Sequence, residues 1–226
     1  MKDTNDIILE NNKDYLIAYK ISGQLSQKSE KGDASVQNQI EAYRKTALHI
    51  LTRLDRPVSG LVVFSKSGSF TTHFLDLQTK SAVTKTYVAI VEGQMNAQAG
   101  TLVNHLVHDK KNQKARVSQT ATDKTREASL DYKIIKALDK YTIVELSLTS
   151  GKFHQIRVQL SECGHPIKGD VKYGARRGNK DRSIHLHARK LVFKDLHKKE
   201  QSYMAAFPSD DSLWKLATEA YSESEN

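Results

Sequence analysis

The sequence predicts an α+β fold built on a mostly antiparallel, mixed central sheet that helices and loops flank. Segments with strand patterns outnumber those with helix patterns, and most of them follow one another in hairpin order, as strands of antiparallel sheets do. The chain has 226 residues, enough to bury the core of one large domain or two small ones. We predict a single domain over residues 1–226 with a core at about 6–207, and no repeat of solenoid period.

The first part of the chain alternates short apolar strands with amphipathic helices. Apolar residues spaced i, i+4 and i+7 indicate a surface helix, and Ser67 is a candidate N-cap for a second one. A continuous apolar run indicates a buried strand. These patterns predict strands at residues 6–10, 15–19 and 61–64, and helices at 34–45 and 67–79.

The second part of the chain carries most of the predicted hairpins. Period-two patterns and turn compositions predict strands at 84–91, 128–138, 141–148, 184–188 and 191–193. A helix is predicted at 153–163 with Gly164 as a left-handed cap, a buried stripe that includes Cys163, and Arg157 on its flank. Ser209 is the predicted N-cap of a last helix at about 209–221. The basic segment 105–126 fits a protruding hairpin and a solvated loop equally well.

The charge balance indicates a polyanionic partner. Lys and Arg number 35 against 26 Asp and Glu, a net charge of +9, which is typical of proteins that bind nucleic acid or an acidic membrane surface. Residues 166–200 hold eleven of the cations and four of the anions, a net of +7 (11 − 4). A soluble enzyme of basic pI with no such partner is the plainer alternative.

Composition also bears on the compartment. No apolar run reaches the length of a membrane helix, and no signal segment opens the sequence, so no membrane association is expected. The single cysteine, Cys163, excludes an internal disulfide and fits a reducing environment. We expect a cytoplasmic protein, and a monomer.

The most informative stretch is residues 51–60, where Asp55 lies between Arg53 and Arg56 ahead of Pro57 and Gly60. Neighbouring positive charge favours the ionised carboxylate and lowers its pKa. An ionised aspartate on a loop that enters a buried strand suits a nucleophile. A solvated cluster of surface charge is the plainer interpretation.

Other chemistries find less support. His185 and His187 are spaced to share one strand face, with His154 or His165 as a third ligand, but no HExxH and no second cysteine accompany them. Neither a G-x-S-x-G elbow nor a glycine-rich phosphate or dinucleotide loop occurs, and nothing nominates a carboxylate partner for a retaining glycosidase. We predict no metal site and no cofactor.

Four segments in order resemble the RluA-type family of RNA pseudouridine synthases, and the resemblance runs from about residue 6 to 207. Each motif alone is weak, and the four in sequence are specific. They are Arg53-Leu54-Asp55-Arg56-Pro57-Val58-Ser59-Gly60-Leu61, then Lys85-Thr86-Tyr87-Val88-Ala89, then residues 151–158 with Gly164-His165-Pro166-Ile167, Gly169-Asp170 and Tyr173-Gly174, and last His187-Ala188 with Leu191 and Phe193.

The resemblance implies the pseudouridine synthase fold, with a catalytic cleft across the sheet, and an isomerisation of uridine that needs no metal or cofactor. It implies that Asp55 is the essential nucleophile or base, and that Arg157 pairs with it. Tyr87 would stack on the target base, with a hydroxyl able to serve in proton transfer. Arg53 would fill the space that the flipped uridine leaves. Attack on the base, attack on the sugar and abstraction of a ribose proton all stay open.

The implied partner is RNA, as a tRNA or rRNA stem-loop, with no S4-type RNA-binding domain in the sequence. The specific RNA and uridine stay open. Basic segments would contact phosphates and make binding salt-dependent. The predicted RNA-binding residues are Arg53, Arg56, Lys85, Lys110, Lys111, Lys114, His154, Gln155 and Lys168.

Some positions depart from the family pattern. Thr52 stands where histidine is common, Lys152 and Phe153 where arginine and threonine are common, and Ile21 where proline is usual. Two rival hypotheses remain: a non-catalytic RNA-binding or RNA-folding module on the same fold, and a metal-dependent nuclease built on the histidines. The presence of Asp55, Tyr87 and Arg157 favours the synthase over the binding module, because binding alone needs no carboxylate facing RNA phosphates.

Overall fold

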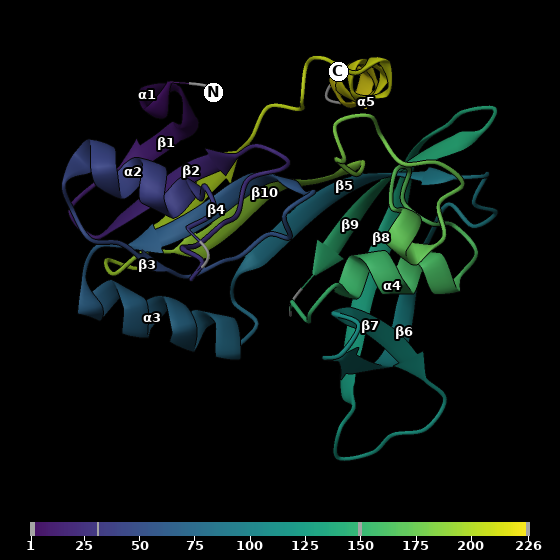
Figure 1. Cartoon of the computed structure of the whole chain (residues 1–226), viewed down its shortest axis with the longest axis horizontal. Helices are drawn as coiled ribbons and strands as arrows, with labels where there is room; N and C mark the ends of the chain where they lie inside the picture. The colour runs from purple at the N-terminus through teal and green to yellow at the C-terminus, as the bar shows by residue number, and fades with distance from the viewer. Residues whose placement is uncertain (1–2, 31, 149–150, 225–226) are drawn as a thin grey trace. The chain divides into compact units, whose positions relative to one another are not determined.

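The computed structural model describes residues 3–30, 32–148 and 151–224, and the chain forms two compact units. The first unit contains Met1–Lys85 and His187–Ala206, and the second contains Thr86–Leu186 and Phe207–Asn226. Helices and mostly antiparallel strands alternate along the chain, which confirms the α+β prediction (Figure 1). The assignment of all residues to one domain stays a prediction.

The first unit is built on a strand group in the order β1, β2, β4, β10. Strand β2 runs antiparallel to β1 and β4, while β10 runs parallel to β4 with His187 opposite Ser59. Strand β3 pairs with β4, and β11 with β10. The bounds are β1 (Ile8–Asn11), β2 (Tyr15–Lys20), β3 (His49–Ile50), β4 (Ser59–Ser65), β10 (Leu186–Lys194) and β11 (Glu200–Met204).

Aromatic side chains fill the core of the first unit between this sheet and helix α3 (Gly68–Thr79). Phe70 and Phe74 of α3 contact Phe193 of β10 at ring distances of 5.9 and 5.3 Å, in the edge-on geometry that aromatic pairs favour. The predicted cap is confirmed, because the Ser67 side chain accepts from the amide of Phe70. Figure 1 shows α2 (Val36–Arg44) above these strands and α3 below them.

A glycine lets two strands of the first unit come together where β4 begins. Gly60 has a φ of +119°, and a Cβ there would lie 2.3 Å from the carbonyl oxygen of Ala188 on β10. No other residue fits so close to backbone atoms. The Gly60 of the predicted motif therefore fixes the end of the loop that carries Asp55.

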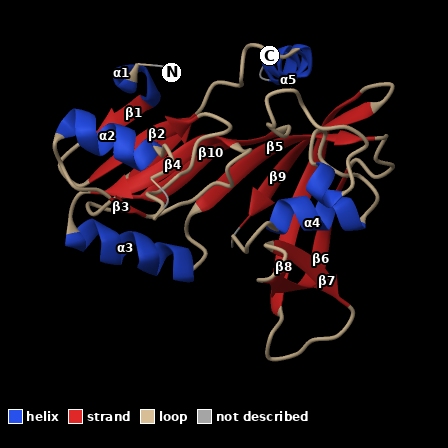
Figure 2. Cartoon of the chain, viewed as in Figure 1, coloured by secondary structure: helices blue, strands red, loops and turns tan. Residues whose placement is uncertain are grey.

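The second unit has its own strand group in the order β5, β9, β8, β6, β7, drawn red in Figure 2. Of the two alternatives for the segment 105–126, the structure shows the hairpin, since β6 and β7 pair antiparallel from His105–Ser118 to Asp109–Lys114. The bounds are β5 (Thr84–Glu92), β6 (Ala99–Asp109), β7 (Lys114–Ser118), β8 (Arg126–Ala137), β9 (Tyr141–Leu148), α4 (Gln155–Glu162), the 3₁₀ helix η1 (Val171–Tyr173) and α5 (Ser212–Ser224).

Several predicted boundaries are corrected. The first strand begins at Ile8, after a one-turn helix α1 (Thr4–Ile7), and the two strands predicted at 184–188 and 191–193 are the single strand β10. Cys163 is exposed and does not belong to a buried stripe. Helix α5 starts after Asp211, whose carboxylate accepts from the amides of Leu213 (2.8 Å) and Trp214 (3.3 Å), so Ser209 is not its cap. No helix in the described ranges is long and apolar enough to span a bilayer.

Candidate active site

The loop that carries Asp55 is held by hydrogen bonds to the backbone of Leu54 and Arg56, the residues on either side of Asp55. Ser26 Oγ accepts from the amide of Leu54 and donates to its carbonyl, each at 2.9 Å. On the other side, the Arg56 carbonyl accepts from the amide of Gly23 at 2.8 Å. The Val58 amide then closes a turn on the Asp55 carbonyl at 3.0 Å. The half-exposed Asp55 carboxylate is therefore presented on a fixed backbone.

A buried lysine lies behind this loop. Lys20 is 0% exposed, and its ammonium donates to the carbonyls of Ile21 (3.1 Å), Gln24 (2.8 Å) and Arg56 (3.3 Å). Burial lowers the pKa of Lys20 to about 7, and the negative charge of Asp55 opposes that shift. This cation cannot be identified from the sequence, because a lysine that ends an apolar strand is ordinarily expected at the surface.

A buried serine–histidine pair fixes the start of β4. Ser59 Oγ lies 2.8 Å from Nδ1 of His187, and both residues are buried. Burial lowers the pKa of His187 to about 3, so the ring is neutral near pH 7. The pair joins β4 to β10 four residues after Asp55, and no sequence pattern indicates that these two side chains meet.

The two arginines beside Asp55 behave differently. Arg53 is exposed, and in the described part of the chain its side chain forms no ion pair. Arg56 Nε donates to the Gly23 carbonyl at 2.9 Å, and its Nη2 lies 4.0 Å from Asp33. Arg56 therefore supports the loop, while an RNA contact by either arginine stays a prediction.

The predicted catalytic arginine forms a buried ion pair within the second unit. Arg157 Nε and Nη2 donate to the two carboxylate oxygens of Asp170 at 2.7 and 2.8 Å. The side chains are 6% and 1% exposed, so Arg157 is buried rather than on a helix flank. A guanidinium has five N–H donors, and a bidentate partner fixes its plane while a second carboxylate can still bind. The predicted pairing with Asp55 stays a prediction.

Tyr87 and Lys85 lie on β5, two residues apart and therefore on one face of the strand. Both side chains are half-buried. Burial lowers the pKa of Lys85. Stacking of the half-buried Tyr87 ring on a base stays a prediction.

Two predicted RNA-binding residues have structural contacts at the start of α4. Gln155 is buried; its Nε2 donates to the Ser129 carbonyl at 2.9 Å, and its Oε1 accepts from the Lys152 amide at 3.0 Å. His154 is half-buried with a φ of +53°. Gln155 therefore attaches the start of α4 to β8. The His154 ring contacts the hydroxyl of Tyr173.

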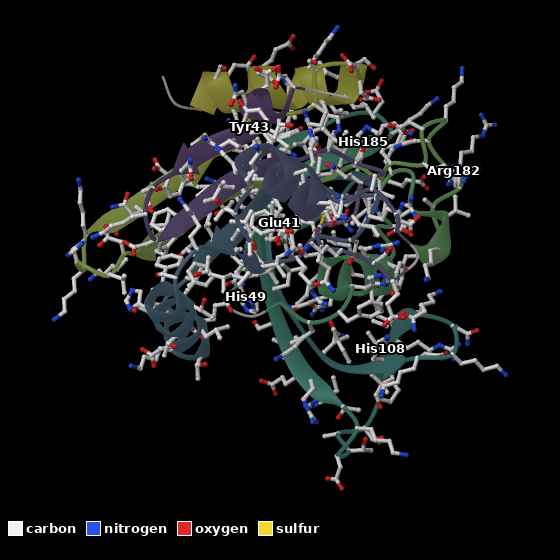
Figure 3. The ribbon with its side chains drawn as sticks, turned by 60° about the vertical axis from the view of Figure 1, so that its left-hand side comes forward. Glu41, Tyr43, His49, His108, Arg182 and His185 are labelled. Carbon is white, nitrogen blue, oxygen red and sulfur yellow. The ribbon has the colours of Figure 1, made fainter. Side chains whose placement is uncertain are left out.

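Exposed cations gather on two segments of the second unit. Lys110 and Lys111 are exposed at the hairpin turn, and Lys168 is half-buried with its Nζ 2.6 Å from Asn179 Oδ1. The loop after η1 carries Arg182, which Figure 3 labels. The exposed cations of this second segment are Arg176, Arg177, Lys180 and Arg182, and Lys172 within η1 is also exposed.

The histidines have protein partners. His185 lies 3.0 Å from Asp211 and 3.2 Å from Asn179, and His187 pairs with Ser59. Over the ranges that the structure covers, no three His, Cys, Asp or Glu side chains form a metal-ligand group. The geometry gives the nuclease hypothesis no support.

Comparison with known protein families adds independent information. Residues 14–162 match the sequence model of the family described as RNA pseudouridylate synthase. The uncharacterized RNA pseudouridine synthase YlyB of Bacillus subtilis is 32% identical over 144 residues, 64% of this chain and 46% of the relative. The ribosomal large subunit pseudouridine synthase D of Borreliella burgdorferi is 31% identical over 161 residues, 70% of this chain and 48% of the relative. The matches thus span about half the length of these relatives.

Solved structures show the same fold. The human RNA pseudouridylate synthase domain containing 4 superposes with a TM-score of 0.75 at 20% identity, covering 96% of this chain and 94% of that one. The human RNA pseudouridylate synthase domain containing 1 gives the same TM-score over 95% of this chain. The α+β fold is therefore that of these proteins.

Proposed function

Because the chain belongs to the family of RNA pseudouridine synthases, we propose that it isomerises uridine in RNA to pseudouridine with Asp55 as the essential residue. The bond between uracil N1 and ribose C1′ breaks, the base rotates, and C5 bonds to C1′ while a proton leaves C5 and N1 becomes protonated. The observation that carries the proposal is the half-exposed Asp55 carboxylate on a backbone fixed by Ser26 and Gly23. A fixed nucleophile lowers the entropic part of the barrier.

The other catalytic roles follow the same proposal. Arg157, whose plane is fixed by Asp170, would hold the Asp55 carboxylate ionised and aimed. Tyr87 would stack on the target base, and Arg53 would occupy the space left by the flipped nucleotide. Flipping a stacked uridine costs a few kcal/mol, so these contacts must offset that cost.

The proposed substrate is a stem-loop of rRNA or tRNA. Two relatives, one from Borreliella burgdorferi and one from Vibrio parahaemolyticus, are named ribosomal large subunit pseudouridine synthases, and these names favour rRNA as the substrate. Lysines of the hairpin turn and cations of the loop after η1 would bind phosphates and release counterions. Affinity for the substrate should therefore fall steeply as salt is added.

The test compares pseudouridine maps of total RNA from cells that carry the gene, lack it, or carry Asp55→Asn. We expect one or a few uridines to lose modification in the deletion and in Asp55→Asn, because an amide is a poor nucleophile and base. Asp76→Asn is the matched control: this exposed carboxylate on α3 pairs with Lys80, so modification should persist.

Two outcomes would contradict the proposal. Identical pseudouridine maps of the deletion and the intact strain would contradict the assigned activity. Full modification by Asp55→Asn would remove the assigned residue. If the purified protein binds RNA with salt-dependent affinity yet no uridine depends on the gene, the non-catalytic RNA-binding module is the correct interpretation.

A further inference from the structure

Tyr173 lies buried where η1 meets the β6–β7 hairpin and helix α4, and the roles proposed above leave it unused. It is 3% exposed. Its hydroxyl accepts from the amide of Ala115 on β7 at 2.8 Å and lies 2.8 Å from Nδ1 of His154, just before α4. One phenol therefore bonds the hairpin and the start of the helix that carries Arg157.

A run of aromatic rings makes the same connection a second time. His108 of β6, labelled in Figure 3, lies 4.1 Å from the Phe153 ring, and Phe153 stacks on His154 at 3.9 Å and 17°. His154 then meets Tyr173 edge-on at 5.5 Å and 81°. Because Phe153 stands where the family commonly has threonine, this stack is not expected from the resemblance alone.

Cations complete the junction. Lys114 Nζ lies 4.9 Å from the centre of the Tyr173 ring, and the Arg157 guanidinium carbon lies 5.0 Å from it. Cations at this distance from an aromatic ring are stabilised by it. In addition, Lys172 Nζ donates to the Gln113 carbonyl at the hairpin turn at 2.5 Å. The hairpin is thus tied to both η1 and α4.

We propose that Tyr173 is a positioning residue that docks the β6–β7 hairpin on α4, so that the hairpin lysines meet RNA in a fixed place relative to Arg157. The inference rests on the proposed function. An undocked hairpin would have to be ordered at the moment RNA binds, and that ordering weakens affinity. A docked hairpin is already ordered in the folded protein, so RNA binding does not bear that cost.

Tyr173→Phe tests this, because it removes the hydroxyl and keeps the ring beside Lys114 and Arg157. Hydrogen–deuterium exchange of the Ala115 amide should accelerate. The affinity for a fluorescein-labelled RNA stem-loop should fall roughly fivefold, which corresponds to the net contribution of one hydrogen bond. The slope of affinity against salt should become shallower as lysine–phosphate contacts are lost. In turnover of the mapped RNA, KM should rise by a larger factor than kcat falls.

The matched control is Tyr221→Phe, which removes a tyrosine hydroxyl bond to Glu145 (2.8 Å) on another part of the same unit. It should change neither RNA affinity nor Ala115 exchange. Phe153→Thr is a second, independent variant that removes the ring stack, and it should shift affinity and exchange in the same direction as Tyr173→Phe. It carries the test if Tyr173→Phe fails to fold.

The proposal is overturned if Tyr173→Phe and Tyr221→Phe have equal RNA affinity and equal Ala115 exchange. A fall in kcat with no change in affinity or KM would also overturn it, since docking would then not govern RNA binding. The binding and exchange measurements need no turnover. Absence of pseudouridine formation by the unmodified protein would therefore refute the proposed function. The binding and exchange measurements would still decide whether Tyr173 docks the hairpin.

Discussion

Replacing Lys20 with methionine should remove a pH dependence from the stability of the first unit. Burial lowers the pKa of Lys20 from 10.5 to about 7 in the folded chain. Between these values the unfolded chain holds a proton that the folded chain has released. The free energy of unfolding of the unmodified protein should therefore rise with pH across this window. Below the window Lys20 is protonated in both states and adds nothing to the slope.

The magnitude follows from one proton. Lys20 is fully buried, so solvent does not screen the effect, and the slope is about 1.4 kcal/mol per pH unit once the folded group is neutral. Over about two pH units above neutrality the unmodified protein should gain roughly 3 kcal/mol relative to Lys20→Met. The methionine variant also leaves the carbonyls of Ile21, Gln24 and Arg56 without this donor, a penalty that does not vary with pH.

The assay is urea unfolding followed by circular dichroism at a series of pH values. Tryptophan fluorescence is unsuitable, because the one tryptophan, Trp214, lies in the second unit. Lys80→Met, at an exposed lysine of the first unit, is the control and should show no slope relative to the unmodified protein. A flat difference between the unmodified protein and Lys20→Met up to about two units above neutrality would refute the reasoning. It would mean that the carbonyls and Asp55 keep the ammonium charged.

Two further substitutions test buried contacts. Asp170→Ala leaves the Arg157 charge buried without its bidentate partner and should cost about 3–5 kcal/mol in urea unfolding, whereas alanine at the exposed Asp139 should change little; equal effects would contradict the importance of the ion pair. Ser59→Ala removes the hydrogen bond to buried His187 and should cost about 1–3 kcal/mol, with recovery in Ser59→Thr; a neutral Ser59→Ala would show that the histidine is held by other contacts.

Local signals predicted the local structure well. The helix after Ser67 and the hairpin of β8 and β9 were both identifiable, because a cap acts within four residues and strand alternation is visible in the sequence itself. The start of α5 was misplaced because Ser209, Asp210 and Asp211 are all acceptable caps. Asp211 is the cap in the structure, and its carboxylate also lies 3.0 Å from His185, a residue distant in sequence.

Contacts between distant segments account for what was missed. The motif placed Arg157 and Asp170 in one family segment, but nothing in their thirteen-residue separation says that the two side chains pair. Lys20 was overlooked for a similar reason, since its burial depends on carbonyls that only the folded loop supplies. Buried charge is defined by its surroundings, and those are a property of the tertiary structure.

The way the Asp55 loop is attached has a consequence for engineering. Its attachments at Leu54 and at the Arg56 carbonyl are made by backbone atoms of the loop, which any residue other than proline could supply. The exposed side chain of Arg53 can therefore be varied without moving the carboxylate. A library randomised at Arg53 should keep Asp55 in place and change only how the space of the flipped uridine is filled, so that the scaffold separates the position of the carboxylate from the contact that replaces the base.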